Sequence, residues 1–149
     1  MSIRQNPKNF LSLEKFSDGP YTEYMKHRVL VVDDEEYITQ IIKEILTDDL
    51  SLEVEVAENG MDGLVCASET VYSIIITDIR MPRMTGLEFV RTLRSREIPN
   101  KNTPVIILSA YSDSMKKEVE GIPNTIIAEK PLAIRNILDT VEGLIKKSS

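Results

Sequence analysis

Short apolar segments alternate with helical patterns along this sequence, and together they predict an α/β fold. The predicted fold is a doubly wound, five-stranded parallel sheet with helices on both faces. Each apolar segment is too short for a helix and is bounded by polar or turn residues. The stretches between them place apolar residues three or four positions apart, as one face of a helix does. This alternation favours parallel strands, because parallel neighbours are joined by helical crossovers.

The strands are predicted at RVLVV, LEVEVA, YSIIIT, PVIILS and TIIAE. Residues 29–32, 74–76 and 105–108 are apolar at consecutive positions, which is typical of central strands covered on both faces. The second segment instead alternates, with Glu53 and Glu55 between apolar neighbours, and so suits a sheet edge. This pattern fits the flavodoxin-like strand order 2-1-3-4-5, with TIIAE at the opposite edge.

Helical periodicity is clearest over residues 38–46 and 134–145, where one apolar stripe repeats. A helix at 60–70 is expected to turn Met61, Leu64 and Val65 inward. A helix at 85–96 is expected to begin at Thr85, because threonine caps helix N-termini well. The helix near 113–120 has the weakest pattern.

Length and composition indicate one globular domain with a tail. The 149 residues suffice for a core, and 42% hydrophobic with 28% charged residues is an ordinary globular balance. The longest apolar runs, of about four residues, are far below the roughly 20 needed to cross a bilayer, so no membrane segment is expected. The N-terminus lacks the pattern of a secretory signal, which makes a cytoplasmic location the default expectation.

Net charge limits which partners are expected, and cysteine content limits which covalent links the chain can form. Eighteen basic against 24 acidic residues give a net charge of −6, without a dense basic patch, so direct nucleic-acid binding is disfavoured. The single cysteine excludes a disulfide within the chain.

Polar residues follow four of the five predicted strands at the point where each ends. They are Asp33 and Asp34 after the first strand, Asp78 after the third, Ser109 after the fourth and Lys130 after the fifth. Ligands of open parallel sheets bind beyond the carboxyl ends of the strands, so these side chains are expected to converge. Taken singly, an acidic residue at a strand-to-helix junction is more often a helix cap than part of a site.

Three carboxylates in one crevice repel one another and need a positive partner. A small cation such as Mg²⁺, or Mn²⁺, would relieve this repulsion, since such ions bind carboxylate oxygens, water and phosphate. An aspartate beside a metal, a lysine and a hydroxyl can act as a nucleophile toward a phosphoryl group. Lys130 and Ser109 would then contact the phosphoryl oxygens.

The segments VLVVDDE, IIITDIRMPRMTGLEFV, PVIILSA and EKPL together resemble the receiver domain of bacterial two-component response regulators, over about residues 27–147. The resemblance implies that Asp78 accepts a phosphoryl group from a histidine kinase or phosphotransfer protein. It also implies a metal site at Asp33, Asp34, Asp78 and the Arg80 backbone carbonyl, in which Asp34 binds the metal directly and Asp33 acts through water. Ser109 would be a switch hydroxyl and Lys130 the phosphate-contacting base. The Lys130–Pro131 bond is cis in the family.

Receivers signal to other proteins, so the resemblance further implies a downstream protein target and a phosphorylation-dependent homodimer as partners. The expected output face comprises the helix near 113–120, the strand at 125–129 and the helix at 134–145. Catalysis would be confined to the protein's own phosphorylation and dephosphorylation.

The chain departs from the family pattern in two places. Ile127 stands where an aromatic residue usually lies, three positions before the lysine, so the signal is expected to run through Ser109 and the loop Ala110–Ser114 instead. Residues 1–26 have no counterpart; a disordered tail and a docking segment both remain open.

Three other functions compete with the receiver interpretation. A phosphohydrolase of the haloacid-dehalogenase type also forms an aspartyl phosphate, but the sequence Asp78-Ile79-Arg80 lacks the second acid of its D-x-D motif. A pseudo-receiver would keep the fold without being phosphorylated, which the complete set of polar residues argues against. A flavodoxin would need a phosphate-binding loop after the first strand, and the sequence has none there.

Overall fold

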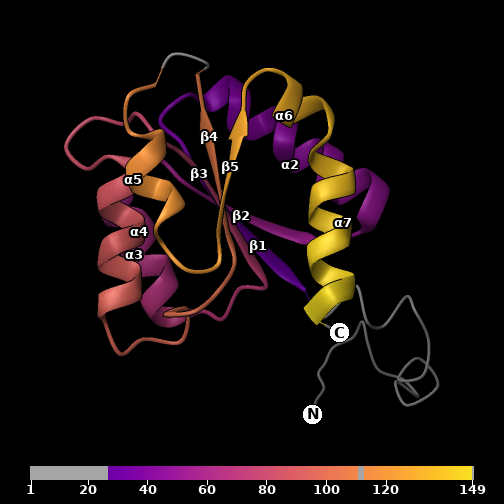
Figure 1. The fold of residues 1–149 in the computed structure, drawn as a ribbon. Coiled ribbons are helices and arrows are strands. Elements are labelled where there is room, and N and C mark those ends of the chain that lie inside the picture. The colour runs from indigo at the N-terminus through magenta and orange to yellow at the C-terminus, as the bar shows by residue number, and fades with distance from the viewer. Residues whose placement is uncertain (1–26, 111–112, 149) are drawn as a thin grey trace, which may run out of the picture.

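The computed structural model describes residues 27–110 and 113–148. Strands and helices alternate from the first strand onward, as the apolar segments predict (Figure 1). The elements are β1 (Arg28–Val32), α2 (Glu36–Leu50), β2 (Glu53–Ala57), α3 (Gly60–Glu69), β3 (Ile74–Asp78), α4 (Gly86–Ser95), β4 (Val105–Ser109), α5 (Lys116–Glu120), β5 (Thr125–Glu129), α6 (Leu132–Arg135) and α7 (Ile137–Ser148).

The five strands form one parallel sheet in the order β2-β1-β3-β4-β5, which confirms the predicted topology. The three inner strands are almost entirely buried, whereas β2 and β5 lie at the edges and are partly exposed. Consecutive apolar residues in β3 and β4 thus point alternately into two separate cores.

Each face of the sheet carries its own core. Alternate strand residues such as Val32, Ile75 and Ile107 pack with α3, α4 and α5, and Phe89 of α4 is fully buried there. The other residues of the same strands, including Val31, Ile76 and Ile106, pack with α2, α6 and α7. Figure 1 shows these two helical layers on either side of the sheet, which is seen nearly edge-on.

Helix α4 begins as predicted. The Thr85 side chain accepts a hydrogen bond from the Glu88 backbone N–H at 3.1 Å, and the Glu88 carboxylate accepts one from the Thr85 N–H at 2.8 Å. This reciprocal pair satisfies two N–H groups that the helix start leaves unpaired.

Two helix predictions are wrong in detail. In α3, Leu64 is buried as expected, but Met61 and Val65 are 54% and 55% exposed, because Gly60, Gly63 and Ala67 form the inward face with Leu64. The C-terminal helix is divided into α6 and α7 at Asn136. The Asn136 carbonyl accepts a hydrogen bond from Thr140 N–H and so begins the second helix.

Candidate functional site

The carboxyl ends of β1 and β3 bring three aspartates together. The two strands are paired in register up to Val32 and Thr77, so the next residue of each, Asp33 and Asp78, emerges at the same edge. One carboxylate oxygen from each of Asp33, Asp34 and Asp78 lies within 4.8 Å of the others. Asp33 and Asp78 are buried, whereas Asp34 is exposed. The predicted convergence of these three residues is therefore present.

Lys130 enters this cluster from the end of β5. Its ammonium nitrogen lies 2.9 Å from Asp78 Oδ1, 4.0 Å from Asp33 Oδ2 and 3.8 Å from Glu35 Oε1. Sequence reasoning did not include Glu35 in the site, although its place in the run of four acidic residues was a signal. The Glu35 backbone N–H donates to Asp33 Oδ1 at 3.0 Å and helps to fix that carboxylate.

Burial dominates the electrostatics of the buried acids. It raises the pKa of Asp33 to about 6, with the charge of Asp78 adding to the effect and the Glu35 N–H and Lys130 opposing it. Burial also raises the pKa of Asp78, against the hydrogen bond and charge of Lys130. Although burial alone would lower the pKa of Lys130, its hydrogen bond to Asp78 and the surrounding carboxylates raise it. The cluster thus holds excess negative charge with one ammonium inside it.

Two buried oxygen atoms in this crevice have no hydrogen-bond partner among the described residues. They are Asp33 Oδ2 and Ser109 Oγ, and Ser109 is fully buried at the end of β4. Strand β4 pairs with β3 up to Asp78 and Leu108, so Ser109 lies one residue beyond that pair. The Ser109 carbonyl accepts from the Lys130 N–H at 2.9 Å. Buried polar atoms without partners are uncommon and mark a place where a ligand atom can bind.

The donor set fits a small hard cation. Three carboxylate oxygens lie within reach of one another, one oxygen of Asp33 has no hydrogen-bond partner, and Asp34 is open to solvent, where water ligands could complete the coordination. Such a cation would also offset the repulsion that helps to raise the pKa of Asp33.

The loop after β3 is held close to the strand end. The Gly86 N–H donates to the Ile79 carbonyl at 2.9 Å, and a side chain at position 86 would bring Cβ to 2.2 Å from the Asp78 carbonyl oxygen. On the other side of the site, the Lys130–Pro131 bond is cis, as the resemblance implies. The glycine thus allows α4 to begin directly against the strand that carries Asp78.

The Arg80 side chain points to the connection between β4 and α5. Its Nε and one terminal nitrogen donate to the Asp113 carboxylate at 3.0 and 3.3 Å. Burial would raise the pKa of Asp113, but the Met115 N–H and Arg80 lower it overall. The sequence did not indicate this pair between Arg80 and Asp113. Of the expected signalling loop Ala110–Ser114, residues 111 and 112 lie outside the described residues.

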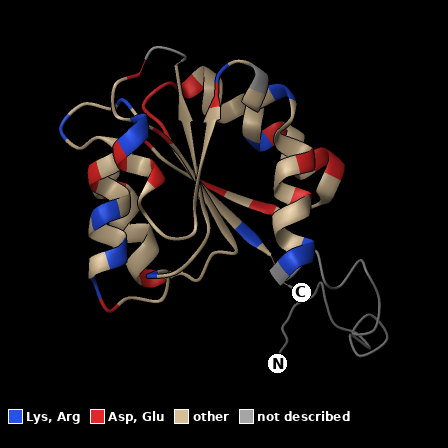
Figure 2. Cartoon of the chain, in the orientation of Figure 1, with Lys and Arg blue, Asp and Glu red and all other residues tan. Residues whose placement is uncertain are grey.

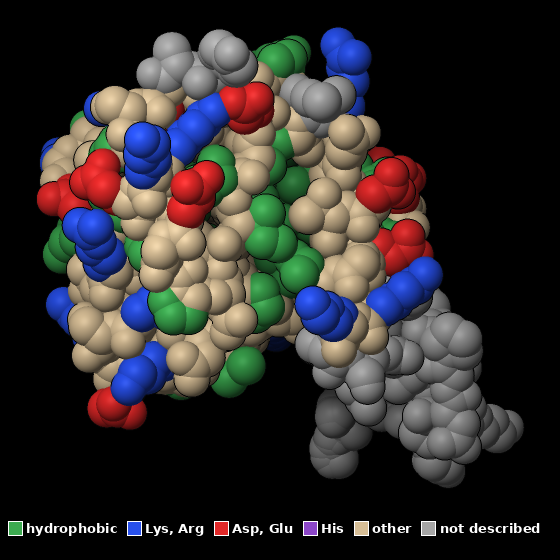
Figure 3. Space-filling view, in the orientation of Figure 1, with side chains coloured by type: hydrophobic (Ala, Val, Ile, Leu, Met, Phe, Trp, Pro, Cys, Tyr) green, Lys and Arg blue, Asp and Glu red, His purple; other side chains and the backbone are tan. Residues whose placement is uncertain are grey.

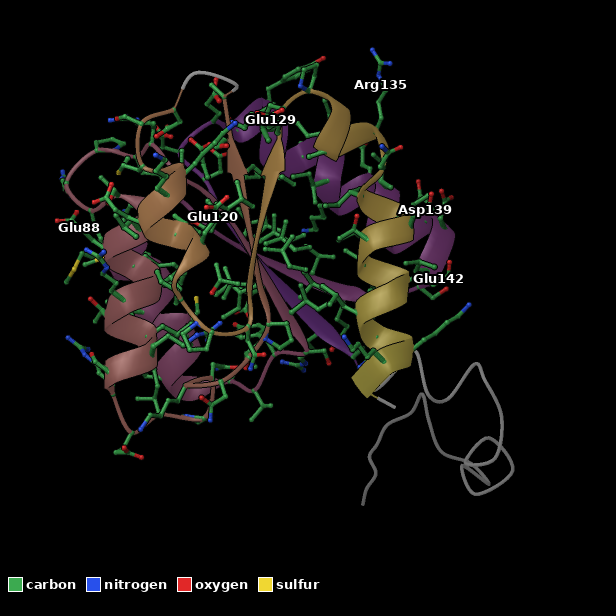
Figure 4. The ribbon with its side chains drawn as sticks, viewed as in Figure 1. Glu88, Glu120, Glu129, Arg135, Asp139 and Glu142 are labelled. Carbon is green, nitrogen blue, oxygen red and sulfur yellow. The ribbon has the colours of Figure 1, made fainter. Side chains whose placement is uncertain are left out.

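Ile127 is half-buried on β5 and packs against the core that α3, α4 and α5 cover. At the β5 edge of the sheet, a groove of about 490 Å³ is lined by residues of α5, β5, α6 and α7, including Glu120, Ile127 and Glu129, and by Asn136 between the last two helices. Figure 4 labels Glu129 at the upper end of β5 and Glu120 on α5. In Figure 2, Lys and Arg lie beside Asp and Glu on several elements rather than on one basic face in this view.

The helices that the structure describes include none long and apolar enough to cross a membrane.

Comparison with protein families gives one match over most of the chain. The family described as response regulator receiver domain matches residues 29–142. The match contains each of the polar residues at the four strand ends described above.

Two curated proteins similar to this chain are named as transcriptional regulatory proteins. A Bacillus subtilis protein named as the uncharacterized transcriptional regulatory protein YkoG is 32% identical over 131 residues, covering 83% of this chain and 53% of that protein. The Staphylococcus aureus transcriptional regulatory protein SrrA is 30% identical over 126 residues, covering 83% of this chain and 50% of that protein. The chain therefore spans about half the length of these relatives.

Solved structures agree in fold and extent. The receiver domain of a Francisella response regulator, 1452, superposes with a TM-score of 0.72 at 30% identity, covering 83% of this chain and 99% of that one. The chemotaxis response regulator CheY4 of Vibrio cholerae gives a TM-score of 0.70 at 33% identity, covering 79% and 98%.

Proposed function

Because this chain belongs to the response regulator receiver domain family, we propose that it is a signalling module whose Asp78 carboxylate accepts a phosphoryl group. The donor would be a histidine kinase or a phosphotransfer protein. One observation carries the proposal: Lys130 contacts Asp78 at 2.9 Å in a crevice that also holds two further aspartates and the unpartnered Ser109 hydroxyl. The domain would extend over residues 27–147, with residues 1–26 as an extension that lies outside the described residues.

In the proposed reaction, an Asp78 carboxylate oxygen attacks the phosphorus atom of a phosphohistidine. The N–P bond breaks, the histidine nitrogen keeps the electron pair, and an acyl phosphate forms on Asp78. Lys130 would move its contact to a phosphoryl oxygen, and the Ser109 hydroxyl, which has no partner, would donate to another.

Asp33, Asp34, Asp78 and the Arg80 carbonyl would hold Mg²⁺ or Mn²⁺. When bound, the cation would neutralise charge on the transferring group and on the crowded carboxylates. Asp33 contributes an oxygen without a hydrogen-bond partner, and the Glu35 N–H fixes its other oxygen. Asp34→Ala should therefore lose most of the Mg²⁺ affinity while the protein stays folded, as measured by calorimetric titration.

The signal would be read at the face formed by α5, β5 and α7. This face carries the groove described above, and Figure 3 shows a strip of hydrophobic side chains running between the helices on the same side of the molecule. An apolar strip flanked by charged residues suits another protein, either a downstream target or a second copy of the phosphorylated chain. The net charge of −6 disfavours direct nucleic-acid contact by this chain.

Intact-mass measurement after incubation with acetyl phosphate and Mg²⁺ tests the proposal. The parent should gain one phosphoryl group, Asp78→Asn should gain none, and Asp62→Asn, a change of a carboxylate on α3, should behave as the parent. Catalytic turnover of p-nitrophenyl phosphate would instead favour a phosphohydrolase, and a parent without any mass gain would favour a pseudo-receiver. Equal mass gain in Asp78→Asn would contradict the choice of phosphoacceptor.

A further inference from the structure

A bidentate ion pair joins the loop after β3 to the loop after β4. Arg80 lies two residues beyond Asp78, and Asp113 lies between the last residue of β4 and the first of α5. The two guanidinium contacts to the carboxylate measure 3.0 and 3.3 Å, and a third runs from Arg80 to Ser114 Oγ at 3.5 Å. We refer to this pair as the Arg80–Asp113 latch. It links the segment that carries the phosphoacceptor to a segment 33 residues away.

The two partners differ sharply in exposure. The Arg80 side chain is 61% exposed, whereas the Asp113 side chain is only 2% exposed. Asp113 as a whole residue is half-buried, so its carboxylate has this low exposure with Arg80 in place. Loss of Arg80 would leave the Asp113 carboxylate without its cation and free to change position, whereas Arg80 itself can turn into solvent.

Asp113 also holds the start of α5. Its Oδ1 accepts a hydrogen bond from the Met115 N–H at 2.8 Å, and Met115 itself supplies no side-chain cap to this five-residue helix. The Met115 carbonyl in turn accepts from the Glu118 and Val119 N–H groups. Displacement of the Asp113 carboxylate would thus remove a contact from the first turn of α5.

A second ion pair connects the start of α5 to the residue before Lys130 of the candidate site. Lys116 forms an ion pair with Glu129, the residue that precedes Lys130 on the chain. Figure 4 shows Glu129 at the end of β5 that faces this loop. The Lys116–Glu129 pair joins α5 to β5, two elements of the face proposed to contact partners, and neither ion pair requires an aromatic residue at position 127.

We propose that the Arg80–Asp113 latch couples phosphorylation of Asp78 to the α5 surface, an inference that rests on the proposed function. A phosphoryl group adds a charge of about −1.5 to −2 and three acceptor oxygens only two residues from Arg80. Guanidinium groups bind phosphate in a bidentate manner, so the phosphoryl group competes with Asp113 for Arg80. Asp113, left without its cation and close to new negative charge, turns outward and releases the Met115 N–H.

Solvent exchange of the Met115 backbone amide, measured by NMR with and without beryllofluoride and Mg²⁺, tests the latch. In the parent, the phosphoryl analogue should accelerate this exchange about tenfold, which is the scale expected for losing a hydrogen bond to a charged group. Arg80→Gln should exchange about fivefold faster than the parent before any analogue is added, and should change little afterwards.

Unlike Arg80→Gln, the Asp113→Asn variant should show slow exchange of the Met115 amide before any analogue is added. The asparagine oxygen can still accept from the Met115 N–H, but it carries no charge to be left unpaired or repelled. Exchange should therefore stay slow and respond less than about twofold to beryllofluoride. Lys101→Gln removes an exposed ion pair with Glu97 elsewhere on the surface, and this control should keep the full response of the parent.

These measurements distinguish failure of the Arg80–Asp113 latch from failure of the proposed function on which it rests. An Ile79 amide shift on adding beryllofluoride reports that the analogue has bound beside Asp78. If that shift occurs and Met115 exchange is unchanged in the parent, or if Arg80→Gln and Asp113→Asn respond as the parent does, the latch is wrong and the proposed function stands. If the parent shows no Ile79 shift and no mass gain with acetyl phosphate, both fail.

Discussion

The Lys130 ammonium nitrogen lies 2.9 Å from Oδ1 of Asp78, so the end of β5 is joined by an ion pair to the end of β3 across the intervening strand β4. This contact holds a positive charge where charge would develop during phosphoryl transfer, and such preorganised partners lower the cost of reaching the transition state.

Replacing Lys130 by alanine should slow phosphorylation of Asp78 about a hundredfold, because one positively charged donor to the phosphoryl oxygens is lost. The pKa of the Asp78 carboxyl should also rise further, since Lys130 opposes the effect of burial more than the Ile79 N–H does. The rate of mass gain with acetyl phosphate and a ¹³C titration of the carboxyl measure the two effects. Lys101→Ala is the control, and an unchanged rate in Lys130→Ala would count against this role.

The raised pKa of Asp33 predicts how stability depends on pH. Its value of about 6 in the fold, against an ordinary 3.8, means that the folded protein binds the proton more tightly than the unfolded chain does. Ionisation of Asp33 therefore lowers the free energy of unfolding as pH rises from 3.8 to about 6, and this loss of stability is complete above that range. At about pH 7.5 and without metal, Asp33→Asn should melt at a higher temperature than the parent, and this difference should shrink toward about pH 4.

At neutral pH, addition of Mg²⁺ should make the parent melt at a higher temperature than Asp33→Asn. The cation would bind the ionised Asp33, so the melting temperature of the parent should rise with Mg²⁺ at about pH 7.5 and rise less at about pH 5, where the proton competes. Asp33→Asn should lose most of this increment at both pH values. A metal-dependent increment that is equal in parent and variant would remove Asp33 from the predicted ligand set.

Gly86→Ala should destabilise the fold by about 1–3 kcal/mol or more, because its Cβ would meet backbone atoms of Asp78 and Ile79 that cannot give way easily. Gly143→Ala is a matched control within α7, since nothing lies within 4 Å of its added Cβ. The control should gain up to about 1 kcal/mol from helix propensity. Urea denaturation measures both; equal stability of the two variants would show that β3 and α4 separate more readily than their contact suggests.

Beryllofluoride should change amide chemical shifts mainly over residues 109–120 and only slightly around Ile127. Ile127 is half-buried, branched at Cβ and restricted to few rotamers, so it has no second arrangement comparable to that of an aromatic side chain. Ile127→Val should keep the parent pattern. Large shifts centred on β5, with small shifts in the loop before α5, would contradict this route.

The sheet and the site could be predicted for the same reason. Consecutive apolar residues indicate strands with two covered faces, and neighbouring parallel strands end at one edge, so the residues after them must meet. Asp33, Asp78, Ser109 and Lys130 follow from that rule alone. Their roles came from the resemblance to receivers and stay predictions.

Other features depend on contacts that a sequence pattern does not carry. The inward face of α3 uses Gly60 and Gly63, because the helix approaches so closely that a Cβ on Gly63 would lie 3.1 Å from Val32 and Phe89. An apolar periodicity instead selects Met61 and Val65, which are exposed. The Arg80–Asp113 latch joins two loops, where no periodicity fixes which side chains meet. The break at Asn136 does not interrupt the apolar repeat on either side, so the repeat could not predict it.

Chemical trapping of the acyl phosphate identifies which carboxylate accepts the phosphoryl group. Borohydride reduces an aspartyl phosphate to homoserine, so the parent can be treated with acetyl phosphate and Mg²⁺, reduced, digested and mapped by mass spectrometry. We expect homoserine at position 78 in the parent, and none when Mg²⁺ is chelated or when Asp78 is replaced by asparagine. Homoserine at Asp33 or Asp34 in place of Asp78, or the same yield at position 78 without a divalent cation, would contradict it.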